Sequence, residues 1–173
     1  MKPKMLVMSG LFAALIAVGA FLRIPLPQVP ITLQTLFVLL AGLLLPKAYA
    51  PLPSLIYLLL GLLGLPIFTG GGGIGYLLHP TFGYLLGFVA AGWVMGRIAT
   101  ETKFFRLLLA ALAGLAVIYL FGTIYYYAVA VWYLGGNLTI ASLLSVCILT
   151  SLPADLIKAV LAAVLAKRLK QYI

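Results

Sequence analysis

The sequence is nearly devoid of acidic side chains. Its 173 residues include two carboxylates, Glu101 and Asp155, with one histidine, His79, and one cysteine, Cys147. A single cysteine excludes a disulfide within the chain and a cysteine-based metal cluster, so we interpret Cys147 as a packing residue. The inventory is also too small for a serine, histidine and acid triad or for a pair of catalytic carboxylates. We therefore expect neither an enzyme nor a metal site.

Charged residues of either sign are scarce, at 8%, whereas apolar residues make up 65% of the chain. A soluble domain has roughly 25% charged residues, so the composition indicates an integral membrane protein surrounded by lipid. At ~20 residues per span, the chain has room for about six helices and none for a separate soluble domain. The net charge of +9 does not indicate nucleic acid binding, because the basic residues occur singly or in short groups at the ends of apolar runs.

Six apolar segments predict an all-α membrane protein with six transmembrane helices in a single domain, residues 1–173. The expected helices cover residues 5–22, 32–45, 48–65, 81–98, 105–131 and 140–167. The first segment also fits a cleavable signal peptide, but five more apolar segments follow it, which favours a helix of the bundle. The second, with Thr32 as its expected cap, spans only roughly 21 Å at 1.5 Å per residue, less than a ~30 Å membrane core. Shielded loop backbone or a water-filled cavity must fill the missing depth.

Most of the basic residues lie at alternate ends of these helices, on one side of the membrane: Lys2, Lys4, Lys47, Arg97, Lys103, Arg106, Lys167, Arg168 and Lys170. The positive-inside rule makes this side cytoplasmic and places both termini there. The longer connections, residues 23–31, 66–80 and 132–139, then lie outside together with most of the polar residues. This distribution predicts structured extracytoplasmic loops and a binding site that opens outward.

An acid and a base, Asp155 and Lys158, lie three residues apart in the last segment, so a helix places them on one face. Counted back from Lys167, they lie roughly 18 and 14 Å above the inner end, which is mid-membrane. An ionised group there costs about 2.5 to 3.5 kcal/mol and usually faces a ligand or ion path. The break Thr150–Pro153 offers backbone amides and a helix N-terminus beside the pair. The alternatives are a mutually neutralised structural pair and a simple kink.

A glycine-rich run, Gly70 to Gly73 with Gly75, precedes the fourth helix. No Lys-Ser or Lys-Thr follows it, so it is not a phosphate-binding loop and the chain has no expected ATP site. Because glycine permits unusual backbone angles, we expect either a lid that wraps a ligand or a flexible connector. His79, just after it, is either a hydrogen-bond partner of a ligand or an interfacial residue without a special role.

Small residues recur every four positions in two helices. They are Ser9, Ala13 and Ala17, with Gly10 and Ala14 alongside, in the first helix, and Gly83, Gly87 and Ala91 in the fourth. Such stripes let another helix approach closely. One stripe can serve packing inside the chain and another a partner contact, and the sequence leaves this choice open.

Three ordered motifs carry a family resemblance over residues 5–167: PITLQT, PTFGYLLGF and DLIKA. With these motifs the chain resembles the BioY family, the biotin-binding S components of energy-coupling-factor (ECF) transporters. The resemblance implies a multi-pass subunit of a prokaryotic plasma membrane that captures biotin from outside and delivers it inward. It also implies a transmembrane coupling protein (T component) and two ABC-type ATPases as partners, with no cofactor in this chain.

The resemblance also implies site residues. The expected ligand-binding set is Asp155, Lys158, Tyr84, Thr81, His79, Tyr76, Gly73 and Gln34, and the helix 1 residues that match the family's A-x-x-x-A docking pattern are Ala13 and Ala17. An ionised Asp155 suits the N–H donors of the ureido group, and Lys158 suits the carboxylate. The loop departs from some members, which carry asparagine or arginine near the glycine-rich run. The rival hypotheses are an S component for another small vitamin and a solitary or proton-coupled carrier that uses Asp155.

Overall fold

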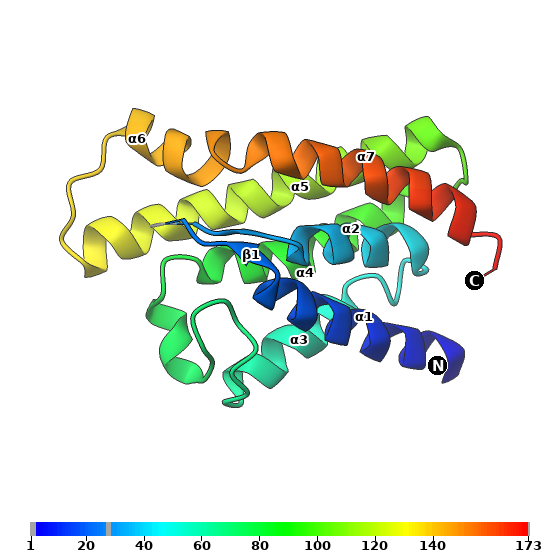
Figure 1. The fold of residues 1–173 in the computed structure, drawn as a ribbon, viewed down its shortest axis with the longest axis horizontal. Coiled ribbons are helices and arrows are strands. Elements are labelled where there is room, and N and C mark those ends of the chain that lie inside the picture. The colour runs from blue at the N-terminus through cyan, green and yellow to red at the C-terminus, as the bar shows by residue number, and fades with distance from the viewer. Residues whose placement is uncertain (1–2, 27–28, 173) are drawn as a thin grey trace.

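Helices dominate the structure, a computed structural model that describes residues 3–26 and 29–172 (Figure 1); Lys2 lies outside the described residues. The helices are α1 (Pro3–Phe21), α2 (Gln34–Leu44), α3 (Leu52–Leu62), α4 (Phe82–Ile98), α5 (Phe104–Tyr127), α6 (Ile140–Leu144) and α7 (Leu152–Leu169). The π-helical turns η2 (Ala128–Tyr133) and η3 (Ser145–Leu149) extend α5 and join α6 to α7. A 3-10 helix, η1 (Ile74–Leu78), precedes α4.

Three helical segments are long and apolar enough to cross a membrane: Pro3–Phe21, Phe104–Tyr133 and Ile140–Leu169. Three shorter apolar helices, α2, α3 and α4, complete the bundle. Over the described residues, the structure confirms the predicted all-helical class, with six helical segments and a short second helix.

The third helix is shorter than the expected residues 48–65. The chain turns after Pro46, whose carbonyl accepts the N–H groups of Tyr49 and Ala50 at 2.7 and 3.0 Å, and α3 begins only at Leu52. The helix is over before Gly64, whose φ of 107° lies outside the helical region and suits glycine. Turns at both ends therefore replace the missing helical residues.

A small hairpin lies where we expected the second helix to start. β1 (Arg23–Ile24) pairs antiparallel with β2 (Ile31–Thr32), with Arg23 opposite Thr32. Thr32 therefore belongs to a strand, and α2 begins two residues later at Gln34. The prediction of a helix beginning at Thr32 was wrong, although the Thr32 hydroxyl still accepts the Gln34 N–H at 3.3 Å.

The two ends of the bundle differ in character. Both chain termini and the connection between α4 and α5 lie at one end, and the hairpin, η1 and the connection from η2 to α6 lie at the other (Figure 1). The elements and connections near the first end carry the basic residues Lys4, Lys47, Arg97 and Lys167. The structure thus places the termini together, and their cytoplasmic orientation stays a prediction.

The small residues of α4 pack inside the chain, against α5. A Cβ atom added at Gly83 would lie 2.2 Å from Cβ of Tyr125, and one at Gly87 would lie 2.9 Å from Cα of Ile118. Both distances are shorter than side chains tolerate, so only glycine allows the two helices to approach this closely. This stripe is an internal contact.

In α1, one of the two small stripes also faces inward. Ser9 is fully buried and Ala13 is 5% exposed, and Ala17 is half-buried. Gly10 and Ala14 are exposed, and a Cβ atom at Gly10 would meet nothing within 4 Å. The structure therefore places Ala13, expected at a partner contact, inside the bundle, and leaves Gly10 and Ala14 on the surface.

Candidate functional site

The break in the last helix positions the acid and base. Before the break, the Thr150 N–H reaches the Ser145 carbonyl, five residues back, at 3.2 Å. After it, α7 starts at Leu152 with Pro153 in the first turn, where the missing proline N–H costs no helix hydrogen bond. The new helix then buries one face, which begins with Asp155 and continues through Lys158, Ala159, Ala162, Ala163 and Ala166. The alanines allow α7 to lie close to α2 and α5.

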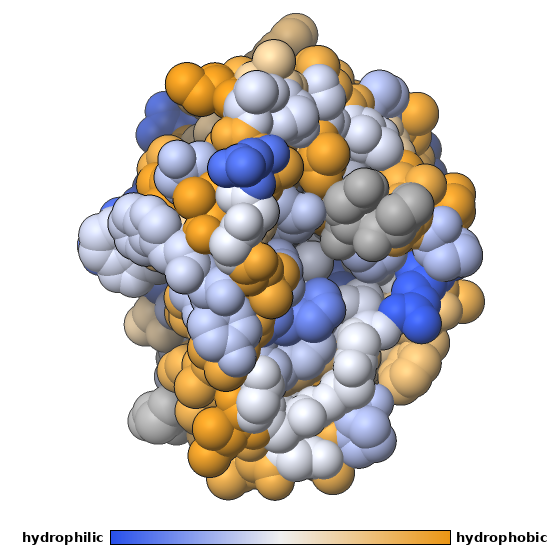
Figure 2. Space-filling model, turned by 90° about the vertical axis from the view of Figure 1, so that its left-hand side faces the viewer, coloured by the Kyte–Doolittle hydropathy of each residue, from blue (hydrophilic) through white to orange (hydrophobic). Residues whose placement is uncertain are grey.

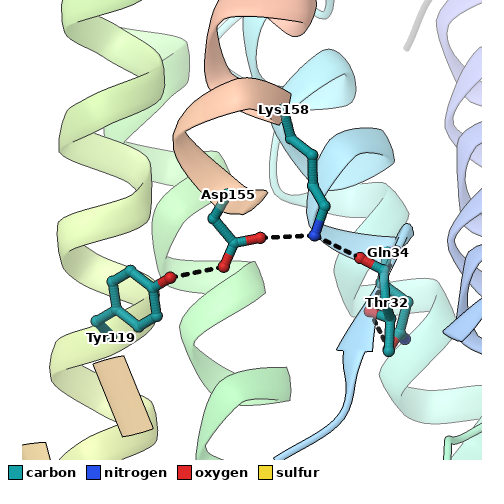
Figure 3. Close-up of polar contacts among 5 residues, drawn as sticks. All are labelled: Thr32, Gln34, Tyr119, Asp155 and Lys158. Atoms are coloured by element: carbon teal, nitrogen blue, oxygen red, sulfur yellow. Dashed lines mark hydrogen bonds and ion pairs between the residues drawn. The ribbon is translucent and has the colours of Figure 1, made fainter. Parts of the chain in front are cut away.

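Asp155 and Lys158 form a buried ion pair with two further partners (Figure 3). Lys158 Nζ lies 2.7 Å from Asp155 Oδ1 and donates a second hydrogen bond to the Thr32 carbonyl at 2.7 Å. The Tyr119 hydroxyl donates to Asp155 Oδ2 at 2.6 Å. The two charged side chains are only 9% and 8% exposed. Such a pair is tolerable at this depth because each charge is neutralised and hydrogen-bonded.

A cavity of about 60 Å³, counted as space open to the centres of water molecules, lies beside this cluster. Its polar lining residues are Thr32, Gln34, Thr35, Thr69, Tyr76, Thr81, Tyr84, Tyr119, Ser151 and Asp155, and its apolar ones are Val29, Pro30, Ile31, Leu85, Phe88 and Ile118. Apolar walls with a few convergent polar groups are typical of small-molecule sites. Figure 2 looks onto the end of the molecule that carries the loops and shows hydrophilic residues around a hollow at the centre of this face.

Five of the residues predicted from the sequence meet at this cavity: Asp155, Tyr84, Thr81, Tyr76 and Gln34. Lys158 is not part of the lining and lies behind Asp155, on the side of the Thr32 carbonyl. Gly73 does not line the cavity either. Its φ of 91° turns the chain, and its N–H donates to the Gly61 carbonyl at 2.7 Å, so it anchors the glycine-rich loop to the end of α3.

His79 lies at the rim and acts through its neighbours. Its ring stacks on Tyr76 with the centroids 4.7 Å apart, and Nδ1 lies 2.8 Å from the Thr81 hydroxyl. Partial burial lowers the pKa of His79 from its ordinary value of 6.5, so the ring is neutral at pH 7 and Nδ1 accepts the Thr81 N–H at 3.3 Å. The histidine therefore supports two lining residues.

Hydrogen bonds from other elements hold two further lining residues, Gln34 and Tyr84. Gln34 Nε2 donates to the Tyr57 hydroxyl at 2.7 Å, which in turn donates to the Ile67 carbonyl at 2.9 Å. The Tyr84 hydroxyl donates to the carbonyl of Cys147, in the π-helical turn η3, at 2.9 Å. Gln34 and Tyr84 are thus held in place by α3 and by the last helix.

The outer loops are fastened to one another. The guanidinium of Arg23, in β1, donates to the carbonyl of Thr69, in the loop after α3. The hydroxyl of Thr69 is 3.1 Å from that of Tyr76, which is 3.1 Å from that of Thr81. The hairpin, the glycine-rich loop and the start of α4 thus form one hydrogen-bonded cover over the cavity.

The cavity lining also contains five polar residues that were not in the predicted site: Thr32, Thr35, Thr69, Tyr119 and Ser151. Tyr119 lies on the same buried face of α5 as Leu115 and Ile118, so helical periodicity could have identified it as an inward polar residue. Ser151 lies four residues before Asp155 and therefore on its face. The Thr32 carbonyl, a backbone atom, carries no such sequence signal.

In class, the bundle is a membrane protein of apolar helices whose ion-paired acid and base lie beside a small cavity of mixed lining, at the end covered by loops. Comparison with known proteins gives the family. A model of the BioY family matches residues 1–173, and the chain belongs to that family.

Relatives agree with this assignment. The probable biotin transporter BioY of Lysinibacillus sphaericus is 46% identical over 169 residues, which cover 95% of this chain and 85% of that protein. The biotin transporter BioY of Thermotoga maritima is 41% identical over 170 residues, with coverage of 97% and 96%. A solved structure described as the S-component for biotin from an ECF-type ABC transporter has a TM-score of 0.84 and 31% identity, and covers 98% of this chain and 92% of that chain. These relatives are transporters rather than enzymes, and they confirm the resemblance noted in the sequence.

Proposed function

We propose that this chain captures biotin from outside the cell in the cavity beside Asp155 and delivers it inward as the S component of an ECF transporter. The names of its relatives support the ligand, and the position of Asp155 supports the site. Asp155 lies on the cavity wall, and each of its carboxylate oxygens receives one hydrogen bond within the protein. A carboxylate oxygen has a second lone pair, so Asp155 retains acceptor capacity for the ureido N–H groups of biotin.

The structure supports a different role for Lys158 from the one we predicted. Two of the three N–H groups of its ammonium are used by Asp155 and the Thr32 carbonyl, and Lys158 is not part of the cavity lining, so a ligand in this cavity would meet Asp155 rather than Lys158. We therefore assign Lys158 the task of neutralising and orienting Asp155, because its ammonium lies 2.7 Å from Oδ1 and fixes one carboxylate oxygen.

Ligand access requires the cover to open. A space of about 60 Å³ holds a few water molecules, whereas pockets for small-molecule ligands typically measure ~300–1,000 Å³. Biotin would enter by displacing the hairpin and the glycine-rich loop and would then be enclosed when they return.

Substitution of the pair tests this proposal. In Asp155→Asn the amide offers one neutral acceptor in place of an ionised carboxylate, and in Lys158→Met the carboxylate loses its cation. We expect each variant to bind biotin at least about tenfold more weakly, since a hydrogen bond to a charged group contributes roughly 1.5–3 kcal/mol. The measurement is equilibrium dialysis of purified protein with labelled biotin.

Glu101→Gln is the matched control, because Glu101 is an exposed carboxylate paired with Lys103 at 3.3 Å and belongs to the connection between α4 and α5, at the end of the bundle opposite the hairpin and η1 (Figure 1). Its affinity for biotin should equal that of the wild type. Unchanged affinity in Asp155→Asn, with the protein still monodisperse, would exclude Asp155 from the site.

Transport requires partners in this proposal. The description of the structural relative as part of an ECF-type ABC transporter supports a coupling protein and two ATPases, and the chain carries no phosphate-binding lysine after its glycine-rich run. Within α1, the exposed residues Gly10 and Ala14 offer a small-residue surface for the coupling protein, in place of the buried Ala13. Biotin uptake by liposomes that contain this chain alone would contradict a need for partners.

A further inference from the structure

Ser151 has a buried hydroxyl for which the described part of the protein supplies no partner. The residue is 5% exposed, and its Oγ is inaccessible to solvent and makes no hydrogen bond. Ser151 also lines the cavity together with Asp155. Buried polar atoms are almost always hydrogen-bonded, so an unpartnered hydroxyl on a residue of the cavity lining points to a bond that a ligand completes when the cavity widens to admit it.

The position of this hydroxyl defines the kind of group it can bind. Ser151 is the residue before the first turn of α7, and its carbonyl accepts the Asp155 N–H at 3.0 Å. The start of a helix carries partial positive charge and N–H groups without acceptors in the helix. A hydroxyl there is suited to donate to an electronegative oxygen, whereas Asp155, one turn or roughly 5.4 Å further on, can only accept.

The first turn of α7 therefore presents a donor and an acceptor side by side. A cyclic urea has the complementary pattern, because its carbonyl oxygen accepts and the adjacent N–H groups donate. The carboxylate of biotin does not fit equally well, since an ionised carboxylate is acceptor-only and has no hydrogen to donate to Asp155.

We propose that Ser151 donates its hydroxyl hydrogen to the ureido oxygen of bound biotin while Asp155 accepts a ureido N–H. Ser151 is then a specificity-determining residue that recognises the ring end of the ligand, and the carboxylate lies toward the outer mouth of the cavity. This assignment rests on the proposed function, in which biotin is the ligand.

The test compares wild type and Ser151→Ala against three ligands: biotin, biotinamide, which lacks the carboxylate charge, and 2-thiobiotin, in which a sulfur atom replaces the ureido oxygen. We expect Ser151→Ala to weaken biotin and biotinamide by the same factor, roughly three- to tenfold, and to weaken 2-thiobiotin clearly less, because its sulfur is a poor acceptor for the hydroxyl and has no hydrogen to donate to it. Affinities are measured by equilibrium dialysis in competition with labelled biotin.

Two controls separate this contact from a structural effect. Because the Ser151 hydroxyl bonds nothing in the empty protein, Ser151→Ala should melt at the same temperature as the wild type or higher. Ser145→Ala, which removes an exposed hydroxyl bonded to the Ala141 carbonyl of its own helix, should leave all three affinities unchanged.

Three results would overturn the proposal. An equal loss for all three ligands would show that Ser151 acts only through the fold, and no loss for any would show that it makes no ligand contact. If Ser151→Ala lowers the affinity for biotin but not for biotinamide, the hydroxyl binds the carboxylate of biotin and not the ureido oxygen. A wild-type protein that does not bind biotin would instead refute the proposed function itself.

Discussion

Tyr119 shows how a single residue prepares the acceptor that the ligand meets. Its hydroxyl donates to Asp155 Oδ2 at 2.6 Å, on the oxygen that the Lys158 bond does not use. With one bond on each oxygen, the carboxylate cannot rotate without breaking both. The remaining lone pairs are thus aimed before biotin arrives.

Removal of this hydroxyl should therefore weaken binding. We expect Tyr119→Phe to lower the affinity for biotin roughly three- to tenfold, the usual contribution of one hydrogen bond, while the buried ring keeps its packing. Equilibrium dialysis gives the affinity, and Tyr127→Phe, on an exposed tyrosine of the same helix, is the control. A tighter complex in Tyr119→Phe would show that the phenol competes with the ligand instead of orienting the acid.

Residue-level prediction from the sequence succeeded where spacing along one helix decides the contact. The three-residue interval between Asp155 and Lys158 predicted a shared face, and the structure has the ion pair at 2.7 Å. The interval could not reveal that Lys158 is also bound to the Thr32 carbonyl, 126 positions away in the chain. That contact depends on how β2 and α7 come together, and it leaves the lysine outside the cavity lining.

Among the elements, α4 and α5 are the pair whose contact depends most directly on glycine, the residue without a side chain. Gly87 faces the backbone of Ile118, where a Cβ atom would be 2.9 Å from Cα and 3.1 Å from the carbonyl oxygen. The backbone of a helix cannot shift locally to relieve such a clash, whereas the end of a flexible side chain can. The two helices must therefore separate if Gly87 acquires a side chain.

We expect Gly87→Val to destabilise the protein by about 1–3 kcal/mol through overpacking and to lower its melting temperature in detergent by several degrees. Gly10→Val is the control, because Gly10 lies in a helix of comparable length with nothing within 4 Å of its added Cβ. Fluorescence-detected thermal unfolding compares the two. Equal melting temperatures would contradict the tight approach of α4 to α5.

Element boundaries were predictable where a proline or a long apolar run marks them. Pro46 correctly predicted the end of a short second helix, and Pro153 the break in the last one. The start of α3 was missed because two prolines, Pro51 and Pro53, are compatible with a helix start anywhere in the preceding turn. The hairpin of β1 and β2 was also missed, since strands of two residues are too short for an alternating pattern.

At the scale of the whole molecule, the two ends of the bundle differ in charge. Most basic residues of the described chain belong to the helix ends and connections next to both termini, such as Lys4 in α1, Arg97 in α4 and Lys167 in α7. Figure 1 shows these parts of the chain at one end of the bundle, as the alternation along the sequence predicted. The small-residue stripes could be recognised in the sequence, but which of them faces a partner depends on the rotation of α1 in the bundle. No local pattern specifies that rotation.

The mutual neutralisation of Asp155 and Lys158 has an electrical consequence. The paired groups present no net charge to the cavity, so the charge that moves on binding is that of the ligand carboxylate alone. Asp155 precedes the last residue of α7, Leu169, by roughly 21 Å of helix, which leaves about a third of a ~30 Å core on the outer side. An elementary charge that crosses a full membrane at 100 mV changes the free energy by ~2.3 kcal/mol.

A carboxylate carried down to Asp155 would thus make biotin affinity about fourfold weaker for each 100 mV of inside-negative potential, by the same conversion. With the ureido ring inward and the carboxylate at the outer mouth, we expect less than a twofold change. Binding to proteoliposomes under imposed potassium diffusion potentials measures this, with uncharged biotinamide as the reference. A fourfold change for biotin alone would mean that the ligand lies the other way round, so the membrane voltage itself reports the orientation of the bound vitamin.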